Sequence, residues 1–423
     1  MEHVAGVLRS LREDAAITQE ELAQKAGLST RTVSDIERGL RKRLYQDTAE
    51  HLAAALGLDD EKREDFVELA RGRTSVVRRQ LDAGFRRRFV AWHVDRVSAL
   101  AGHVGHEEQW YAVLDADEPN LTVALRWAAD AGDTESLLRL GAGLWRYWQA
   151  RGDLATGRRW LQSGLDAVPP PNPASRMTAL WGLAWLAYQQ GDDACASECA
   201  RELAGLARQV DDAAARRNAA TITGIVSLAR EDVAAAMTSL EEALELARGR
   251  EESWLLPTSL LNVGIAKIAA RETDDARRLI GEALRAYAEL GDERFRARSL
   301  GYLGLAALVD GDAQRGEALF VHSLALFDAL GEAKGIADAL TGLAMAAVNR
   351  GLPLRAAQLG GAAERLRESF AGRALPVERR LAEIELARAK KEVGDVDWGA
   401  AWTSGRALRQ DEAIAVALVP PAG

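Results

Sequence analysis

A 40-residue repeat constrains the fold of this chain more than any other feature. Between Met177 and Pro376 three positions of the repeat are well marked. One position suits a turn between two helices and holds Gly191, Glu231, Arg271, Gly311 and Gly351. Five residues later stand Ala196, Ala236, Ala276, Gly316 and Ala356, and seven residues before the turn stand Ala184, Gly224, Gly264, Gly304 and Ala344. Since a large side chain at a crossing would hold two helices apart, the pattern predicts stacked helical hairpins.

Leucines recur at two further positions of the repeat. They are Leu244, Leu284 and Leu324 at one position, and Leu180, Leu260, Leu300 and Leu340 at the other. The pattern resembles a tetratricopeptide array whose hairpins are about six residues longer than the usual 34. No segment has the alternation of a strand. We therefore predict an all-α protein, with an α-solenoid of five such repeats over residues 177–376.

The regular array is flanked by less regular helical sequence. Residues 137–168 form a degenerate repeat whose turn, at Gly152, is one residue out of phase, and PPPNP at 169–173 separates it from the array. Consecutive prolines cannot continue a helix. Because end repeats must cover a face that has no neighbour, we interpret residues 97–168 as an N-terminal cap of the solenoid and 377–418 as a C-terminal cap.

The N-terminal part contains a different motif, TQEELAQKAGLSTRTVSDIERG, at residues 18–39. Thr18 and Ser29 are good helix N-caps, and Gly27 permits the left-handed backbone that ends the first helix. In the second helix Val33 and Ile36 share the face that would be buried. The motif therefore predicts two short helices joined by a tight turn.

The second of these helices carries polar and basic residues on its outer side. Arg31 suits guanine, Asp35 suits the amino group of cytosine, and Thr30 suits a thymine methyl group or a phosphate. The basic cluster at residues 41–43 suits phosphate oxygens, which position a protein on DNA without carrying sequence information. The outer side is therefore a candidate surface for the DNA major groove.

The motif resembles the helix-turn-helix of the phage-repressor, or XRE-type, family. The matching residues are Gln19, Leu22, Ala23, Gly27, Leu28, Ser29, Val33, Ser34, Ile36, Glu37 and Gly39. The resemblance implies a phosphate contact for Gln19 and base contacts for Thr30, Arg31 and Asp35, with flanking helices at Val4–Asp14 and Thr48–Leu56. The DNA-binding residues predicted for the domain at 1–72 are Gln19, Ser29, Thr30, Arg31, Thr32, Ser34, Asp35, Arg38, Arg41, Lys42 and Arg43. The alternative is a helical hairpin that has kept the fold but lost its affinity for DNA.

The charge distribution agrees with a DNA-binding N-terminal part. The whole chain has 54 basic and 63 acidic residues, but residues 25–43 have six basic and two acidic ones. Residues 71–96 have eight basic and two acidic ones, so we interpret 73–96 as a basic linker or helix, most simply as a solvated charged face. The acidic repeat region would be repelled by DNA.

By analogy with tetratricopeptide proteins, the first helix of each hairpin lines the inner wall of the array. The predicted ligand groove holds Trp181, Trp185, Tyr188, Asn218, Ile225, Leu261, Asn262, Ile265, Tyr302 and Met345. An apolar concave surface of this kind suits a peptide, a protein segment or a small molecule. The alternative is that these side chains pack inside a tight superhelix. Only Asn262 stands where peptide-binding arrays place their recurrent asparagines, and the chain has few lysines, of which Lys267 is expected on an inner helix.

The whole chain resembles bacterial regulators in which an XRE-type domain, an NB-ARC-type ATPase and a tetratricopeptide array follow one another. Residues 107–133 resemble that family's approach to the array, and 399–418 its C-terminal end. The ATPase is missing from the sequence, because a P-loop needs Gly-Lys and this dipeptide does not occur. We therefore expect no nucleotide and no other cofactor.

The sequence offers little for catalysis, metal binding or membrane insertion. His103, His106 and Glu107 form H-x-x-H-E, but glycines interrupt them and no third ligand is evident. Cys195 and Cys199 are interpreted as small core residues of a cytoplasmic protein. No stretch is long and apolar enough for a membrane span, and the first residues do not resemble a signal peptide. We predict that the protein is not an enzyme.

These features together predict a cytoplasmic transcriptional regulator. It would bind double-stranded DNA through its first domain and an effector in the array, and it would act as a homodimer, because one helix-turn-helix makes too few contacts for tight specific binding. The competing hypothesis is an interaction scaffold whose helix-turn-helix is vestigial. A DNA-binding titration distinguishes the two.

Overall fold

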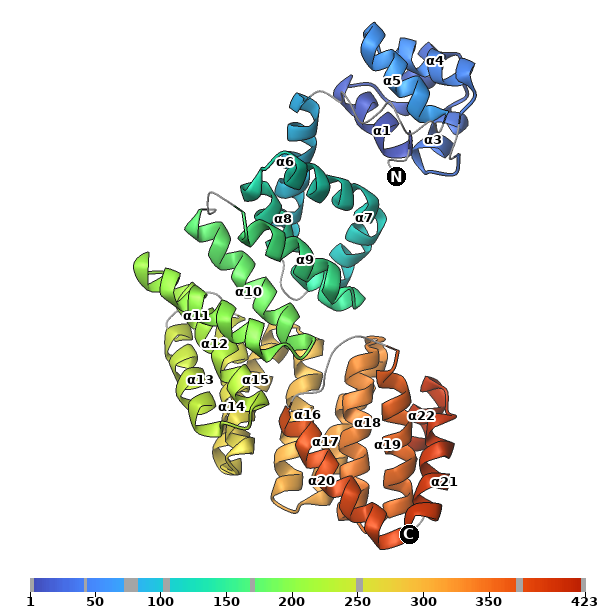
Figure 1. Ribbon diagram of the computed structural model, residues 1–423. Coiled ribbons are helices and arrows are strands. Elements are labelled where there is room, and N and C mark those ends of the chain that lie inside the picture. Colours follow the sequence, from blue (N-terminus) through green and yellow to red (C-terminus); the bar gives the residue numbers. More distant parts are fainter. Residues whose placement is uncertain are drawn as a thin grey trace. The chain divides into compact units, whose positions relative to one another are not determined.

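The computed structural model describes residues 4–41, 44–71, 83–101, 107–167, 172–248, 254–369 and 376–419. All regular elements among these residues are α-helices, which confirms the predicted all-α fold (Figure 1). The chain divides into two compact units. The first comprises residues 1–97 and 112–136, and the second comprises residues 98–111 and 137–423.

The first unit begins with a bundle of short helices. These are α1 (Val4–Asp14), α2 (Gln19–Ala26), α3 (Thr30–Glu37), α4 (Gln46–Ala55) and α5 (Asp60–Ala70). Its core contains Leu8, Leu22, Val33, Ile36 and Leu52, all with 0% of their surface exposed. The apolar positions expected from helical periodicity thus face one another, and they hold α2 and α3 against α1 and α4.

Two longer helices follow, α6 (Ala83–Ala101) and α7 (Glu107–Asp130). Residues 83–96 of the predicted basic linker belong to α6, whereas 73–82 lie outside the described residues. Part of the basic charge is used in packing. The guanidinium of Arg86 lies 5.2 Å from the centre of the Trp127 ring, and Arg96 Nε lies 3.8 Å from Asp117 Oδ2. These contacts stabilise α6 against α7 without involving a ligand.

The second unit is a solenoid of helical hairpins. Their first helices are α8 (Thr134–Arg151), α10 (Pro173–Gln189), α12 (Ala213–Ala229), α14 (Leu255–Ala269), α16 (Glu293–Val309) and α18 (Ala333–Asn349). The second helices are α9 (Leu154–Leu165), α11 (Asp193–Gln209), α13 (Val233–Ala247), α15 (Thr273–Leu290), α17 (Ala313–Ala329) and α19 (Pro353–Arg367). Each first helix from α10 to α16 contacts both its partner and the first helix of the next hairpin. The array is therefore a continuous stack.

The backbone has the same 40-residue period as the sequence. The turn position has a left-handed conformation in every repeat, with φ of 80° at Gly191, 63° at Glu231, 61° at Arg271, 81° at Gly311 and 73° at Gly351. The crossing position also behaves as expected. A Cβ on Gly224 would meet the Leu240 side chain 2.5 Å away and the Ala236 carbonyl oxygen 3.2 Å away. Small residues recur because α12 and its counterparts cross their partner helices at this point.

Three helices end the chain: α20 (Pro376–Val393), α21 (Asp395–Arg406) and α22 (Gln410–Leu418). They begin one residue before the C-terminal cap that the sequence predicts at 377–418 and end with it at Leu418. α20 packs on α18 and α19, but it also contacts α12 and α14, and Arg380 forms an ion pair with Glu231. This helix thus joins the end of the array to hairpins far back in the sequence.

Several smaller expectations concern single side chains. Cys199 is buried and Cys195 half-buried on α11, and both thiols are free. His103 and His106 lie outside the described residues.

Within the described part of the chain, no helix combines the length and apolar character needed to cross a bilayer.

Candidate functional site

The helix-turn-helix is fixed by local hydrogen bonds that the sequence motif indicates. Thr18 Oγ1 accepts from the Glu21 amide at 3.2 Å, and the Glu21 carboxylate accepts from the Thr18 amide at 2.7 Å. Gly27 ends α2 with φ +66°. Ser29 Oγ then accepts from the Thr32 amide at 3.1 Å and begins α3. These contacts stabilise the two helix termini and the turn between them.

The outer side of α3 is accessible, as the sequence predicts. The Arg31 side chain is 90% exposed and that of Arg38 is 59% exposed, and Thr30 is also exposed. Ser34 is half-buried on the same helix. Arg41 follows the helix and is exposed, whereas Lys42 and Arg43 lie outside the described residues. The helix therefore presents guanidinium groups on the side opposite its core.

Asp35 lies between these arginines. Its carboxylate accepts from Arg38 Nη2 at 2.8 Å and lies 4.0 Å from Arg31 Nε. A base amino group would have to compete with both guanidinium groups for this acceptor. Asp35 is therefore better placed to orient Arg31 and Arg38 than to accept a hydrogen bond from cytosine.

A buried ion pair lies on the core side of α3, and the sequence did not predict it. The Glu37 side chain is 0% exposed and accepts from Arg12 Nε at 2.7 Å and Arg12 Nη2 at 3.1 Å. This hydrogen bonding raises the pKa of Arg12 above its ordinary value, despite partial burial. Gln19 Nε2 also donates to Glu37, at 2.7 Å, so a phosphate contact by Gln19 would have to use its second N–H. The pair fixes α3 relative to α1 and α2.

Two of the predicted DNA-binding residues have a structural role. The hydroxyl groups of Ser29 and Thr32 lie 2.8 Å apart, in addition to the capping bond. Both hydroxyl groups are thus engaged at the start of α3, whereas the neighbouring Thr30 and Arg31 are exposed and take no part in capping.

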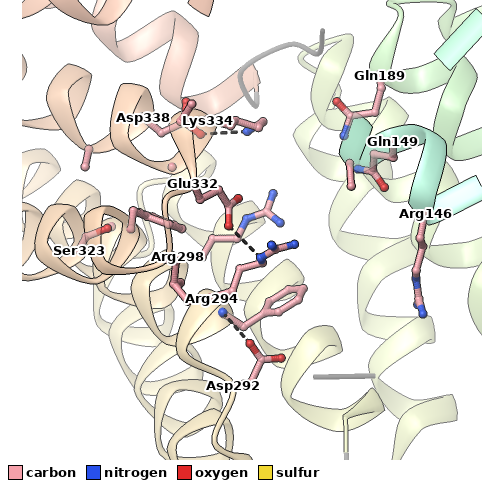
Figure 2. Close-up of a pocket in the computed structure, with 18 of the residues that line it drawn as sticks. Arg146, Gln149, Gln189, Asp292, Arg294, Arg298, Ser323, Glu332, Lys334 and Asp338 are labelled. Carbon is pink, nitrogen blue, oxygen red and sulfur yellow. Dashed lines mark hydrogen bonds and ion pairs between the residues drawn. The ribbon is translucent and has the colours of Figure 1, made fainter. Parts of the chain in front are cut away.

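The second unit contains a cavity of about 1250 Å³. Its lining side chains come from α8, α10, α16, α18 and the first turn of α20, among other segments. Figure 2 shows Arg146, Gln149 and Gln189 on one side, and Arg294, Arg298, Glu332, Lys334 and Asp338 on the other. Both sides contribute charged or polar groups that point toward the open space.

An aromatic cluster forms part of the cavity wall. The Trp145 and Trp185 rings are nearly parallel, with centres 6.5 Å apart, and Trp181 meets Trp185 edge to face at 5.6 Å. The guanidinium of Arg146 lies 5.1 Å from the centre of the Trp145 ring and 5.6 Å from that of Trp254. Cation–π contacts of this kind hold a positive charge without neutralising it.

Residues 3–66 match the family model of a helix-turn-helix domain. The match covers the helices and the turn described above. No curated protein matches the chain.

The chain is also similar to solved helical structures at low sequence identity. Bacillus thuringiensis PlcR, solved with the peptide PapR7 and DNA, is 13% identical over 78% of this chain and 96% of its own, with a TM-score of 0.36. A Rap protein complexed with Competence and Sporulation Factor is 13% identical over 78% of this chain and 94% of its own, with a TM-score of 0.49. The signal transduction ATPase PH0952 from Pyrococcus horikoshii, which has a tetratricopeptide repeat sensor, is 14% identical over 96% of this chain and 63% of its own, with a TM-score of 0.49.

The predicted groove residues divide into two groups. Trp181, Trp185 and Tyr302 line the cavity. The remaining seven do not line it, and they are Tyr188, Asn218, Ile225, Leu261, Asn262, Ile265 and Met345. Five of these seven, namely Tyr188, Ile225, Leu261, Ile265 and Met345, are at most 5% exposed. Each first helix packs against its partner and against neighbouring first helices, so the face that carries these five residues belongs to the core. They pack inside the superhelix, which is the alternative given above, and do not line a groove.

The cavity residues that sequence reasoning missed carry a signal in the repeat. WRYWQ at 145–149 and WLAYQ at 185–189 place a tryptophan and a glutamine at positions that are 40 residues apart. The motif lies across the boundary between the predicted N-terminal cap and the regular array. Arg294 has a basic counterpart 40 residues later in Lys334, whereas Arg298 has none, and only the tertiary structure places them opposite Gln149 and Gln189.

Proposed function

We infer that this chain is a DNA-binding transcriptional regulator, acting in the cytoplasm, whose tetratricopeptide-like array receives an effector. The observation that carries the proposal is the side chain of Arg31. It is 90% exposed on a capped helix that a buried ion pair holds in place, within a domain that matches a helix-turn-helix family model. A guanidinium presented in this way suits the two acceptors of guanine in the major groove.

The other predicted contacts take complementary roles in this proposal. Arg38 and Arg41 bind phosphates and fix the register, while Asp35 orients the guanidinium groups on both of its sides. A single domain of this size supplies few contacts, so the active form is a homodimer on two half-sites about one helical turn of DNA apart.

The cavity in the array is the effector site in this proposal. Its volume of about 1250 Å³ exceeds the range of about 300–1,000 Å³ that is usual for drug-sized ligands. A peptide or a protein segment therefore suits it better than a small metabolite. Effector binding would alter DNA affinity by favouring one arrangement of the dimer over another.

A fluorescence anisotropy titration against the DNA upstream of the protein's own gene tests the regulator. Specific binding should weaken steeply as salt increases, because bound phosphates release counterions. Arg31→Ala should lose preference for the specific site, by about 1–3 kcal/mol, and Arg41→Ala should weaken binding to all DNA alike. Arg285→Ala, an exposed change on α15 in the second unit, serves as the control.

Equal affinity of the wild type, Arg31→Ala and Arg41→Ala for specific and random DNA would contradict the proposal. That outcome would favour the alternative of an interaction scaffold. In that case the array binds a protein partner, and the exposed arginines of the helix-turn-helix do not bind DNA.

A further inference from the structure

Two glutamines at equivalent repeat positions line the cavity. Gln149 is near the end of α8 and Gln189 is the last residue of α10, 40 residues later. Both side chains are half-buried, and neither amide has a hydrogen-bond partner among the described residues. In Figure 2 both amides project from neighbouring helices toward the cavity. The array thus presents the same polar group twice, one hairpin apart, without a protein partner in the described part of the chain.

The chemistry of a carboxamide matches that of a peptide backbone. It offers a donor and an acceptor in one plane, so it can pair with the C=O and N–H groups of an extended chain. Packed helices lie about 8–10 Å apart, and an extended polyproline-type peptide advances about 9 Å in three residues. Amides on adjacent first helices can therefore meet equivalent backbone groups of one extended peptide.

The cavity also contains two guanidinium groups that lie against aromatic rings and form no ion pair within 4 Å among the described residues. Arg146 lies between the rings of Trp145 and Trp254, and Arg298 lies 5.8 Å from the centre of the Phe295 ring. Neither lies within ion-pair distance of a described carboxylate, although Arg298 hydrogen-bonds with Tyr302 and is acted on by the charges of Glu378 and Asp338. In contrast, Arg294 Nε lies 2.8 Å from Glu332 Oε2.

Most carboxylates of the cavity are already engaged. Lys334 Nζ lies 2.9 Å and Arg367 Nη2 3.2 Å from the Asp338 carboxylate, and Glu368 accepts from Arg406 at 2.8 Å. Asp292 caps α16 by accepting from the Phe295 amide at 3.0 Å. Glu378 is the exception, and its burial near Asp338 raises its pKa to about 7. It lies near Arg298 and Asp338, and its charge acts on Arg298.

We propose that the cavity binds an extended acidic peptide, with Gln149 and Gln189 holding its backbone and Arg146 and Arg298 binding its side-chain carboxylates. The tryptophans of the wall take its apolar side chains. This assignment rests on the proposed function of the cavity as the effector site, and it names the chemical class of the effector.

Affinity selection from a random peptide pool tests the proposal. The full-length protein is incubated with heptapeptides that are acetylated and amidated at their ends, so that only side chains carry charge, and retained peptides are identified by mass spectrometry. Peptides with Asp or Glu should be enriched over the input. For a retained acidic peptide, Arg146→Gln and Arg298→Gln should each raise Kd about tenfold, as expected for one charge-assisted hydrogen bond.

Matched variants separate these contacts from general effects on folding. Gln149→Ala with Gln189→Ala should weaken binding of acidic and neutral peptides by the same factor, because the backbone contact is independent of side-chain charge. Arg298→Lys should keep the preference for acids. Arg201→Gln and Gln209→Ala, both exposed on α11 and outside the cavity lining, should change nothing.

Retention of no peptide, a preference for basic peptides, or the same affinity in all cavity variants would overturn the proposal. The selection contains no DNA, so it can fail while site-specific DNA binding by the same preparation persists. Conversely, an acidic preference that depends on both arginines would stand even if the protein did not bind DNA.

Discussion

At the scale of single residues, the N-terminal domain depends on one buried acid. Glu37 follows Ile36 at the end of α3, and its carboxylate receives three hydrogen bonds from Arg12 and Gln19. A carboxylate without exposure is costly unless all its acceptor sites are used. The pair therefore sets the position of the helix that carries Arg31, although it faces away from any ligand.

Arg12→Met should destabilise this domain by about 3 kcal/mol, because it leaves a buried carboxylate with too few donors. Hydrogen exchange of the α1–α4 amides in the full-length chain measures the effect, and protection should fall about 100-fold. Arg31→Ala, at a side chain that is 90% exposed, is the control and should leave protection unchanged.

The double variant Arg12→Met with Glu37→Leu refines this test. Replacing both members by apolar groups removes the unpaired charge and should recover most of the lost protection. If the single variant has wild-type protection, the ion pair does not hold α3 in place.

At the scale of elements, close packing between helices decides where glycine is required. α19 and α21 approach each other so closely that a Cβ on Gly405 would overlap the Gln358 backbone carbonyl. Backbone cannot move aside as a flexible side chain can. Gly399, on the same helix, has no heavy atom within 4 Å of its Cβ position. Two glycines of one helix therefore have different roles.

Gly405→Ala should destabilise the C-terminal helices by about 2–3 kcal/mol, as expected for overpacking. Gly399→Ala should instead stabilise α21 by about 0.5–1 kcal/mol, because alanine is the better helix former. Urea unfolding and hydrogen exchange of α21 measure both. Equal effects of the two changes would show that the α19–α21 approach is looser than the structure indicates.

At the scale of the whole molecule, each unit is organised by contacts between segments far apart in sequence. Within the solenoid, α20 returns to α12 and α14 and places Glu378 in the cavity beside Asp338. Burial and the Asp338 charge raise the pKa of Glu378 to about 7 from an ordinary 4.5, against the opposing effects of Lys334, Arg298 and Arg367. The folded protein thus retains a proton that the unfolded chain releases.

This proton makes stability depend on pH. Since the folded-state pKa is raised, the contribution is fully present below pH 4.5 and is lost as pH rises to about 7. Glu378→Gln should therefore raise Tm at pH 8 and have little effect at pH 5. Each unit of pKa shift changes the free energy of unfolding by about 1.4 kcal/mol at most, because solvent screens the charge of a partly exposed group. A Tm difference that is the same at both pH values would contradict the assignment.

The sequence by itself determined the all-α fold, the helix-turn-helix and the period of the array. These features depend on local rules, such as the caps at Thr18 and Ser29 and small residues at helix crossings, and such rules act within one hairpin. Only the tertiary structure decided which side chains share the cavity and that Glu37 is buried against Arg12. Arg146 and Arg298 lie on helices four hairpins apart, and a periodic pattern tells which face of a helix is apolar but not which distant helix will stand opposite.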